Sequence, residues 1–516
     1  MCLLVALSYN SGQLDGRSPR CSHRRGHTPV NDAPSSPALP RWARAVDLFT
    51  TALLILVVQV WAFGRIDFGT WLRIGETWRL WLIVVAAAGL RHYYVPHPSL
   101  PARIFGFVRR GVRDEAFRST WPTTVTTRLA VLLVGYLGVV AVGFPPGTPP
   151  IRVSNNEAAN LALRWDTGWY MQIALEGYRY EPNNVGQQNI AFFPGYPLAV
   201  RAAANLLGSQ RIFGERELPP GMAMEQLQQR FLVAGLIVSL VAFGWGLMWL
   251  YRLARQHLDD SAARSALLLM SAYPFAVYFS AAYTEALMLL ALAASFYLVG
   301  QQRWGPAAAF ALLGGITRPN GFLLAGPLGV IVLKQLLEKR NAGAPQVELT
   351  RHAVLGLTVA ALPALGVGLY SLYIYSLTGD LLAWREAHTA WGRSYTGFPT
   401  LFTPVTLITE QGLVEYTTSQ PIEALNAVAA IAAVVMIWPI TTRLGLEYGL
   451  LMLLNIAPPM LFGGFLSMGR VTSLLFPMFF LTASVLSGRQ RQNLTVGFAL
   501  LQGFTAILFF TWRRML

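Results

Sequence analysis

Long apolar runs recur along most of this chain and alternate with short polar segments. A helix needs about 20 apolar residues to cross roughly 30 Å of hydrocarbon, and many of these runs approach that length. The pattern predicts an all-α polytopic membrane protein with about 13 transmembrane helices. The expected spans are 47–63, 74–91, 128–145, 231–250, 262–281, 283–300, 306–317, 319–336, 352–377, 421–441, 445–466, 470–487 and 492–512.

Two long stretches interrupt this pattern, namely residues 146–230 and 378–420. Within the first stretch, the moderately apolar piece 192–207 predicts a juxtamembrane amphipathic helix. A shorter break, Arg318-Pro319-Asn320-Gly321, separates two of the expected spans. Because such breaks are tolerated only where backbone lines a cavity or is buried in protein, this one predicts an irregular segment inside the helical domain.

The distribution of positive charge predicts the orientation of the chain. Charged residues make up 13% of the sequence, about half the share in soluble proteins, yet the formal net charge is +15. The N-terminal segment 1–46 and the loops on the same side of the predicted topology hold 24 of the 40 Lys and Arg residues. The positive-inside rule places the N-terminus and these loops in the cytoplasm, and both long stretches outside. The basic charge is therefore assigned to membrane orientation, and no nucleic-acid partner is expected.

These patterns predict three regions. Residues 1–46 form a basic, disordered cytoplasmic tail, 47–127 form a transmembrane hairpin with a basic cytoplasmic loop, and 128–516 form the main membrane domain. The two cysteines, Cys2 and Cys21, both lie in the tail. They provide no disulfide framework or metal cluster, so no metal site is expected.

The first external loop carries the most distinctive candidate chemistry, in the sequence Arg164-Trp165-Asp166-Thr167-Gly168-Trp169-Tyr170. Aromatic rings suit sugar stacking, and a carboxylate among them suits a general base. Arg164, Trp165, Trp169 and Tyr170 are therefore candidates for substrate binding. The same residues also fit an interfacial aromatic belt with a surface aspartate. The residues alone leave both interpretations open.

Further candidates lie at the outer ends of spans or in the second external loop. Glu285 is a carboxylate at membrane depth, which is a functional candidate but also fits an interhelical hydrogen bond. Arg318, Arg393 and Arg470 suit a phosphate group, through charge-assisted hydrogen bonds. The alternative is that each guanidinium reaches toward lipid headgroups. Asn320 follows Arg318 in the polar break and is the last candidate for substrate binding.

Taken together, these segments resemble the PIG-V-type mannosyltransferases, the family of GPI mannosyltransferase 2, within the GT-C superfamily. The matching blocks are RWDTGWYMQIALEGY with AFFPGYPL (164–198), YPFAVYFSAAYTEALMLL (273–290), GITRPNGFLLAG (315–326), and GDLLAWREAHTAWGRS with SMGRVTSLLFPMFF (379–394 and 467–480). The resemblance implies a GT-C fold and a polyprenyl- or dolichyl-phosphate-linked mannose donor. It also implies that the acidic residue of the first external loop, which is Asp166 here, is catalytic.

The resemblance and the residues together predict a membrane-embedded mannosyltransferase that acts by a single inverting displacement. Asp166 is the expected general base, with Glu176 as the alternative carboxylate. Its partners would be a lipid-phosphate sugar donor and a lipid- or protein-linked acceptor, in a multi-pass cell membrane or, in a eukaryote, the ER membrane. No resident cofactor is expected, while a divalent ion that enters with the donor phosphate stays open. The alternatives are a secondary transporter and a non-catalytic GT-C-like subunit.

Overall fold

The computed structural model describes residues 39–515, except 64–65, 69–71, 75–76, 149–150, 185, 210–221 and 396. Most of the predicted basic tail, with Cys2 and Cys21, lies outside the described residues. The last six residues assigned to that tail, 41–46, belong instead to the first described helix, which begins at Arg41. This boundary was predicted too late because the basic start of the helix resembles a polar tail.

The N-terminal unit is a helical hairpin followed by a crossing helix. Its elements are α2 (Arg41–Phe63), β1 (Ile66–Phe68), β2 (Leu72–Ile74), α3 (Thr77–Tyr94) and α4 (Leu100–Arg113). The strands pair antiparallel, with Ile66 opposite Ile74. They depart from the all-α prediction in a minor way, because they only reverse the chain between two helices. Every other regular element in the described part of the chain is helical.

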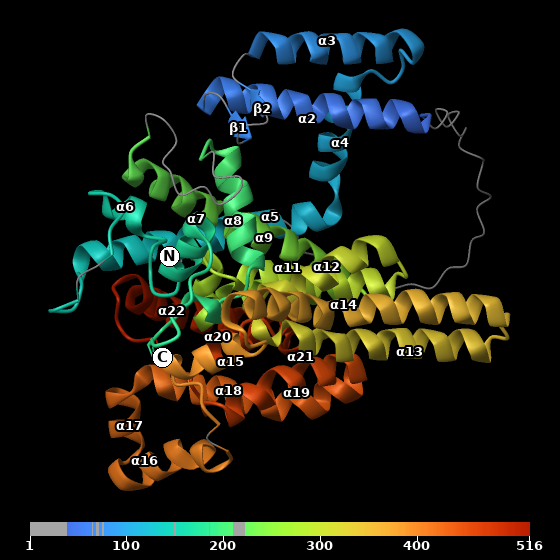
Figure 1. Cartoon of the computed structure of the whole chain (residues 1–516). Coiled ribbons are helices and arrows are strands. Elements are labelled where there is room, and N and C mark those ends of the chain that lie inside the picture. Colours follow the sequence, from blue (N-terminus) through green and yellow to red (C-terminus); the bar gives the residue numbers. More distant parts are fainter. Residues whose placement is uncertain are drawn as a thin grey trace, which may run out of the picture.

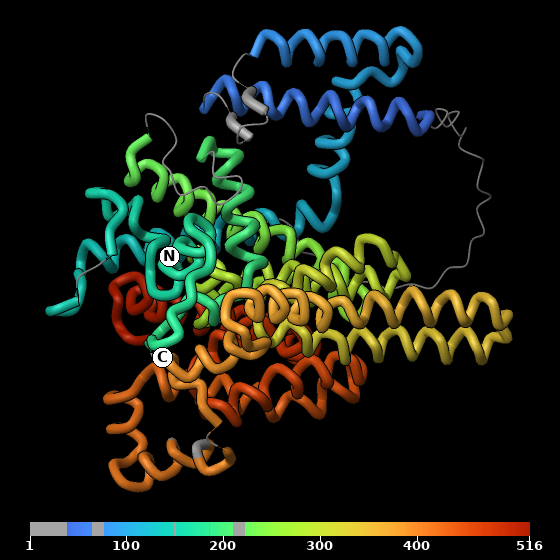
Figure 2. Tube along the Cα trace, viewed as in Figure 1, coloured from blue at the N-terminus to red at the C-terminus, as the bar shows by residue number. Residues whose placement is uncertain are grey.

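The main domain is a bundle built around α11, whose residues are almost all buried. Helix α11 packs between α9 and α12, and α13 lies beside α14 as a long antiparallel pair (Figures 1 and 2). The elements of the bundle are α5 (Glu115–Ala141), α9 (Met224–Ala254), α10 (Asp260–Ala272), η2 (Pro274–Ser280), α11 (Glu285–Gly300), α12 (Trp304–Thr317), η3 (Pro319–Leu324), α13 (Ala325–Asn341), α14 (Gln346–Thr378), α18 (Pro421–Arg443), α19 (Leu446–Leu461), α20 (Met468–Thr472), α21 (Phe476–Val485) and α22 (Gly488–Phe510).

The two long interruptions of the apolar pattern contain short helices. The first holds α6 (Glu157–Asn160), α7 (Thr167–Glu176), η1 (Asn189–Ala191) and α8 (Gly195–Leu206). The second holds α15 (Ala383–Ala387), η4 (His388–Trp391), η5 (Pro399–Phe402), α16 (Thr403–Gln411) and α17 (Leu413–Ser419). Helix α8 is the helix expected within 192–207, shortened at its start by the Phe193-Pro194-Gly195 turn.

The chain is a helical polytopic membrane protein. Among the described residues, 7 helices are long and apolar enough to cross a membrane, or up to 8 if the bent pair α10 and η2 counts as one span. Four shorter apolar helices, α11, α12, α19 and α21, lie among them in the bundle. A total of about 13 spans stays a prediction, because length and composition alone do not assign these shorter helices.

The predicted break after α12 is the 3-10 helix η3. A Cβ atom at Gly321 would lie 2.1 Å from the backbone oxygen of Gly314, so glycine allows η3 to fold back against α12. The break turns the chain at the same end of the bundle where α11 begins. This arrangement brings Arg318 close to Glu285, although 33 residues separate them in the sequence.

Candidate active site

Asp166 lies directly before α7, in a loop that hydrogen bonds hold against the bundle. The neighbouring Arg164 is fully buried and donates hydrogen bonds to the backbone oxygens of Phe510 (2.7 Å) and Asn160 (2.6 Å). Trp165 has a positive φ of 51° and donates its indole N–H to the oxygen of Phe509. Arg164 and Trp165 were predicted to bind substrate, but their polar groups point to backbone and hold the Asp166 loop.

Arg470 is the centre of the charged cluster. Its Nη1 donates to Oδ2 of Asp166 at 2.7 Å, and its Nε donates to Oε1 of Glu285. The guanidinium also lies over the ring of Tyr283, 4.8 Å from the centroid, a favourable cation–π geometry. Arg470, from the short helix α20, therefore links a carboxylate before α7 to a carboxylate at the start of α11.

Glu285 completes the cluster from inside the bundle. Its side chain is 0% exposed, and it accepts hydrogen bonds from both Arg470 and Arg318. Arg318 also lies 3.3 Å from the hydroxyl of Thr284. Two carboxylates and two guanidinium groups thus balance one another in charge. Since burial leaves Glu285 little room to touch a substrate, its position suits a residue that holds the two arginines in place.

The structure therefore brings together four of the predicted residues, Asp166, Glu285, Arg318 and Arg470, from distant parts of the sequence. Asp166 is the more accessible carboxylate, with 21% of its side chain exposed. Asn320 lies apart from the ion pairs and donates to the side-chain oxygen of Asn455 at 2.8 Å.

The aromatic side chains near Asp166 form a packed wall. Trp169 stacks on Phe192 and meets Trp391 edge to face, both at 5.8 Å between centroids. Tyr170 is buried and packs against Tyr283. Of these two predicted sugar-stacking residues, Trp169 is partly exposed, whereas Tyr170 is buried and packs beneath the wall. Trp391 shows that the second long loop packs over α7.

The same second loop contributes Arg393 and His388. Arg393 donates from Nη2 to the oxygen of Leu466 at 3.0 Å, while its Nη1 is buried without a hydrogen-bond partner among the described residues. Burial, with the nearby charges of Arg470 and Arg318, lowers the pKa of Arg393 to about 10, so it stays charged at neutral pH. A buried cation with an open donor beside the cluster is suited to an anionic group.

Tyr283 also belongs to the site, and His388 lies in the same loop as Arg393; neither was predicted as a site residue from the sequence. The hydroxyl of Tyr283 accepts the backbone N–H of Asp166 at 2.9 Å, which fixes the carboxylate-bearing turn. Burial lowers the pKa of His388 below its ordinary value of 6.5, so its ring is neutral at pH 7. Tyr283 could have been selected because it lies two residues before Glu285, whereas no pattern in the sequence pointed to His388.

An apolar groove of about 390 Å³ begins on α7 and runs between α8 and α14. Its walls include Ile173, Leu198 and Tyr373, and Arg201 is a basic residue in its lining. Asp166 lies directly before α7, and the groove begins toward the C-terminal end of the same helix. Elsewhere in the described part of the chain, no three His, Cys, Asp or Glu side chains gather to hold a metal ion.

These features define a polytopic membrane protein with a charged site at one end of its helices. Residues 146–377 match the family described as Mannosyltransferase (PIG-V). The matched range contains Asp166, Glu285 and Arg318, whereas Arg393 and Arg470 lie beyond it.

The chain is also similar to two curated proteins. The chain is 28% identical to GPI alpha-1,6-mannosyltransferase 2 of Mus musculus over 208 residues, 39% of this chain and 38% of the relative. It is 33% identical to GPI alpha-1,6-mannosyltransferase 2 of Rattus norvegicus over 166 residues, 32% of this chain and 30% of the relative. The matches thus cover only about a third of each relative's length. No solved structure matches the chain.

Proposed function

We propose that this protein is a GT-C-type mannosyltransferase that transfers mannose from a polyprenyl- or dolichyl-phosphate donor to a lipid- or protein-linked acceptor. The observation that carries the proposal is the Asp166–Arg470 contact. It places a partly exposed carboxylate beside guanidinium groups, at the end of the bundle and within the family-matched region. The transfer needs both a carboxylate and a cation, because the acceptor hydroxyl loses a proton while the donor releases its phosphate.

The proposed reaction is one displacement at the anomeric carbon of mannose. The acceptor oxygen forms a bond to this carbon while the bond to the donor phosphate oxygen breaks, and the electron pair leaves with the phosphate. The acceptor proton passes to Asp166, which acts as general base. A single displacement inverts the anomeric configuration. One carboxylate is enough, since the phosphate leaves without protonation, unlike the leaving group in glycoside hydrolysis.

The arginines would stabilise the phosphate as its charge develops. Arg393 offers the buried Nη1 that has no hydrogen-bond partner among the described residues, and Arg470 and Arg318 add positive charge nearby. An arriving phosphate would also compete with Asp166 for the Arg470 guanidinium. That competition would free the carboxylate oxygen for the acceptor proton, so donor binding would prepare the base.

The membrane setting supports a lipid-linked donor. The groove beside α7 offers apolar walls for part of an isoprenoid chain, with Arg201 among its lining residues. By the arginine asymmetry, the loops that carry Asp166 and Arg393 face away from the cytoplasm. A secondary transporter is disfavoured, because the ionisable candidates lie at helix ends rather than at the midplane and the family is one of transferases.

A matched pair of substitutions tests the assignment of Asp166. General-base catalysis is typically worth about 10²–10⁴ in rate, so Asp166→Asn should lower mannose transfer by that order. Glu176→Gln is the control, because Glu176 lies at the far end of α7, about 15 Å along the helix axis, and pairs with Arg179. Transfer is measured from labelled polyprenyl-phosphate-mannose to acceptors in a membrane extract. Full activity of Asp166→Asn with loss in Glu176→Gln would transfer the role to Glu176.

A further inference from the structure

Helix α4, which precedes the family-matched region, divides sharply into two faces. With 100° per residue, Ile104, Phe105, Phe107, Val108 and Val112 fall on one side of the helix. The opposite side carries Arg103, Arg109, Arg110 and Arg113, and the helix contains no acidic residue. Such a separation of apolar and basic residues is typical of helices that lie in a membrane surface.

The apolar face of α4 is not covered by the rest of the described chain. No residue of the helix is buried, and Phe105 and Phe107 are 75% and 73% exposed. A continuous apolar face in water is unfavourable, so it requires a covering layer. Both ends of α4 are nevertheless fastened to the protein, which fixes the helix in place. Arg103 pairs with Asp47 of α2, and Asp114, the residue after α4, pairs with Arg252 of α9.

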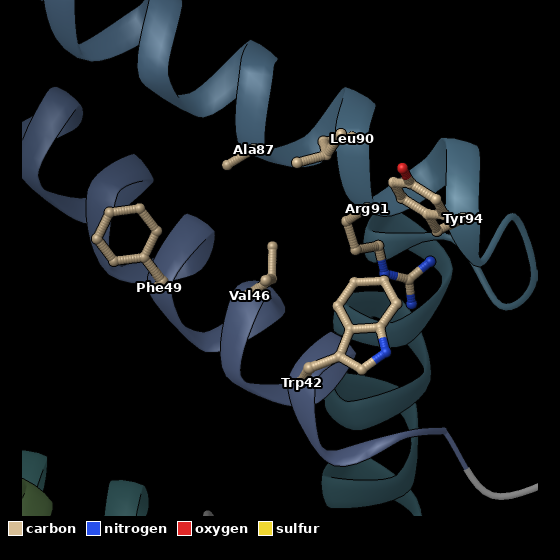
Figure 3. Close-up of a pocket in the computed structure, with 7 residues that line it drawn as sticks. All are labelled: Trp42, Val46, Phe49, Ala87, Leu90, Arg91 and Tyr94. Carbon is tan, nitrogen blue, oxygen red and sulfur yellow. The ribbon is translucent and has the colours of Figure 1, made fainter.

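The surroundings of α4 mark the level of a membrane interface. Trp42 at the start of α2 and Tyr93 and Tyr94 at the end of α3 are exposed aromatic residues that contact one another. Aromatic side chains of this kind gather at membrane–water boundaries. Trp42 and Tyr94 also border an open apolar groove between α2 and α3, with Arg91 at the same end (Figure 3).

The direction of α4 also fits a position at the membrane interface. In Figure 1 it runs crosswise to α2 and α3, whose axes follow the direction of α13 and α14. A helix at right angles to membrane-spanning helices lies along the membrane surface. Its apolar side can then enter the hydrocarbon boundary while its basic side meets the headgroups.

We propose that α4 is an interfacial helix that binds anionic phospholipid headgroups of the membrane in which the protein is embedded. The positive charge of the basic face favours a lipid with an anionic headgroup. Arg103 is already paired, but Arg109, Arg110 and Arg113 are exposed and form no ion pair among the described residues. Guanidinium groups bind phosphate through charge-assisted, often bidentate, hydrogen bonds. The arginine asymmetry assigns this surface to the cytoplasmic leaflet.

Spin labels on the two faces test the position of α4 in the full chain. In a Cys2→Ser, Cys21→Ser background, single labels are attached at Val108→Cys on the apolar face and at Arg110→Cys on the basic face. The protein is reconstituted in phosphatidylcholine vesicles containing phosphatidylglycerol. The apolar site should be accessible to oxygen and the basic site to an aqueous nickel chelate. Equal access of the chelate to both sites would overturn the proposal, and so would protection of both sites, which would indicate a protein partner.

Lipid titration tests the selectivity for anionic headgroups. The variant Arg109→Gln, Arg110→Gln, Arg113→Gln is compared with Arg340→Gln, Arg351→Gln, Arg489→Gln, three exposed arginines elsewhere on the predicted cytoplasmic side. Each arginine near an anionic surface is worth about fivefold, so the first variant should bind phosphatidylglycerol on the order of 100-fold more weakly. The control should retain most binding. Equal losses in both variants, or none in the first, would contradict a specific site on α4.

Discussion

The cluster around Asp47 and the cluster around Glu285 are both built from buried carboxylates and arginines, yet their surroundings differ. In the N-terminal unit, the Asp47 carboxylate is shared by Arg91, at 2.9 Å, and Arg103, and it joins α2, α3 and α4. In the bundle, Glu285 is likewise shared by two arginines, but Arg470 reaches on to a second carboxylate, Asp166. The partly exposed group of the first cluster is a cation, Arg103, whereas the second cluster ends at a partly exposed carboxylate, Asp166.

This difference shows that a buried ion cluster alone does not indicate a catalytic site. Both clusters hold helices together, as buried ion pairs commonly do. The bundle cluster has additional features: an accessible carboxylate, an aromatic wall that includes Trp169, and the open Nη1 of Arg393 nearby. It also overlaps the family-matched region. These additions are the reason for proposing the bundle cluster, and not the Asp47 cluster, as the reactive site.

The largest expected effect is a loss of stability in both clusters, and mannose transfer then distinguishes them. Glu285→Gln should lower the free energy of unfolding by about 3–5 kcal/mol, because it leaves two buried arginines with one carboxylate fewer. Asp47→Asn should also destabilise, since the Arg91 side chain is only 1% exposed. Thermal melting of both variants and their mannose transfer are measured in parallel. Transfer should fall in Glu285→Gln beyond what unfolding explains and stay normal in folded Asp47→Asn. Normal transfer by both would remove Glu285 from the site.

A smaller effect is expected for Arg470→Met. Losing charge-assisted hydrogen bonds should cost about 1.5–3 kcal/mol, roughly 10- to 150-fold in kcat/KM for the donor. The matched change in the other cluster is Arg91→Met. It removes a guanidinium from a side chain that is 1% exposed, against 13% for Arg470, and should leave donor kinetics unchanged. Titration of polyprenyl-phosphate-mannose provides the measurement. Unchanged kinetics in a folded Arg470→Met variant would show that this arginine only joins helices.

The smallest effect is expected for Arg393→Gln, which keeps a hydrogen-bond donor near Leu466 but removes the charge. Because Arg393 is proposed to meet the phosphate from one side of the cluster, KM for the donor should rise by about tenfold, the scale of one charged hydrogen bond. Arg385→Gln in the same loop is the control. An equal rise in both variants would assign the effect to loop charge in general.

Much of the bundle site could be predicted from the sequence, because apolar helices leave few places for charge. Glu285, Arg318 and Arg470 stand out where charge meets the ends of apolar runs, and Asp166 stands out among the aromatic residues of the first long loop. These four residues meet in the structure. Arg164 carried the same signal but folds back onto the oxygens of Phe510 and Asn160. The direction of a side chain within a loop depends on tertiary contacts that a single chain pattern does not encode.

The fold was predictable to a similar degree. The break at Arg318 and the helix within 192–207 were located correctly, because glycine, proline and polar residues interrupt the apolar pattern there. The first helix boundary and the β1–β2 turn were not, since the basic start of α2 resembles a tail and three-residue strands leave almost no periodic signal. The near-complete burial of α11, which makes Glu285 inaccessible, appears only when the helices are packed.

The most direct test of the central claim is mannose transfer by the purified wild-type protein. Labelled polyprenyl-phosphate-mannose is incubated with the reconstituted protein and a membrane extract as the source of acceptors, and a parallel reaction contains a nucleotide-linked mannose. The proposed transferase should yield a labelled glycan product and free polyprenyl phosphate from the lipid donor, and should not transfer mannose directly from the nucleotide sugar. Label that stays in the intact donor, or intact donor that only crosses the bilayer, would contradict the proposed transferase.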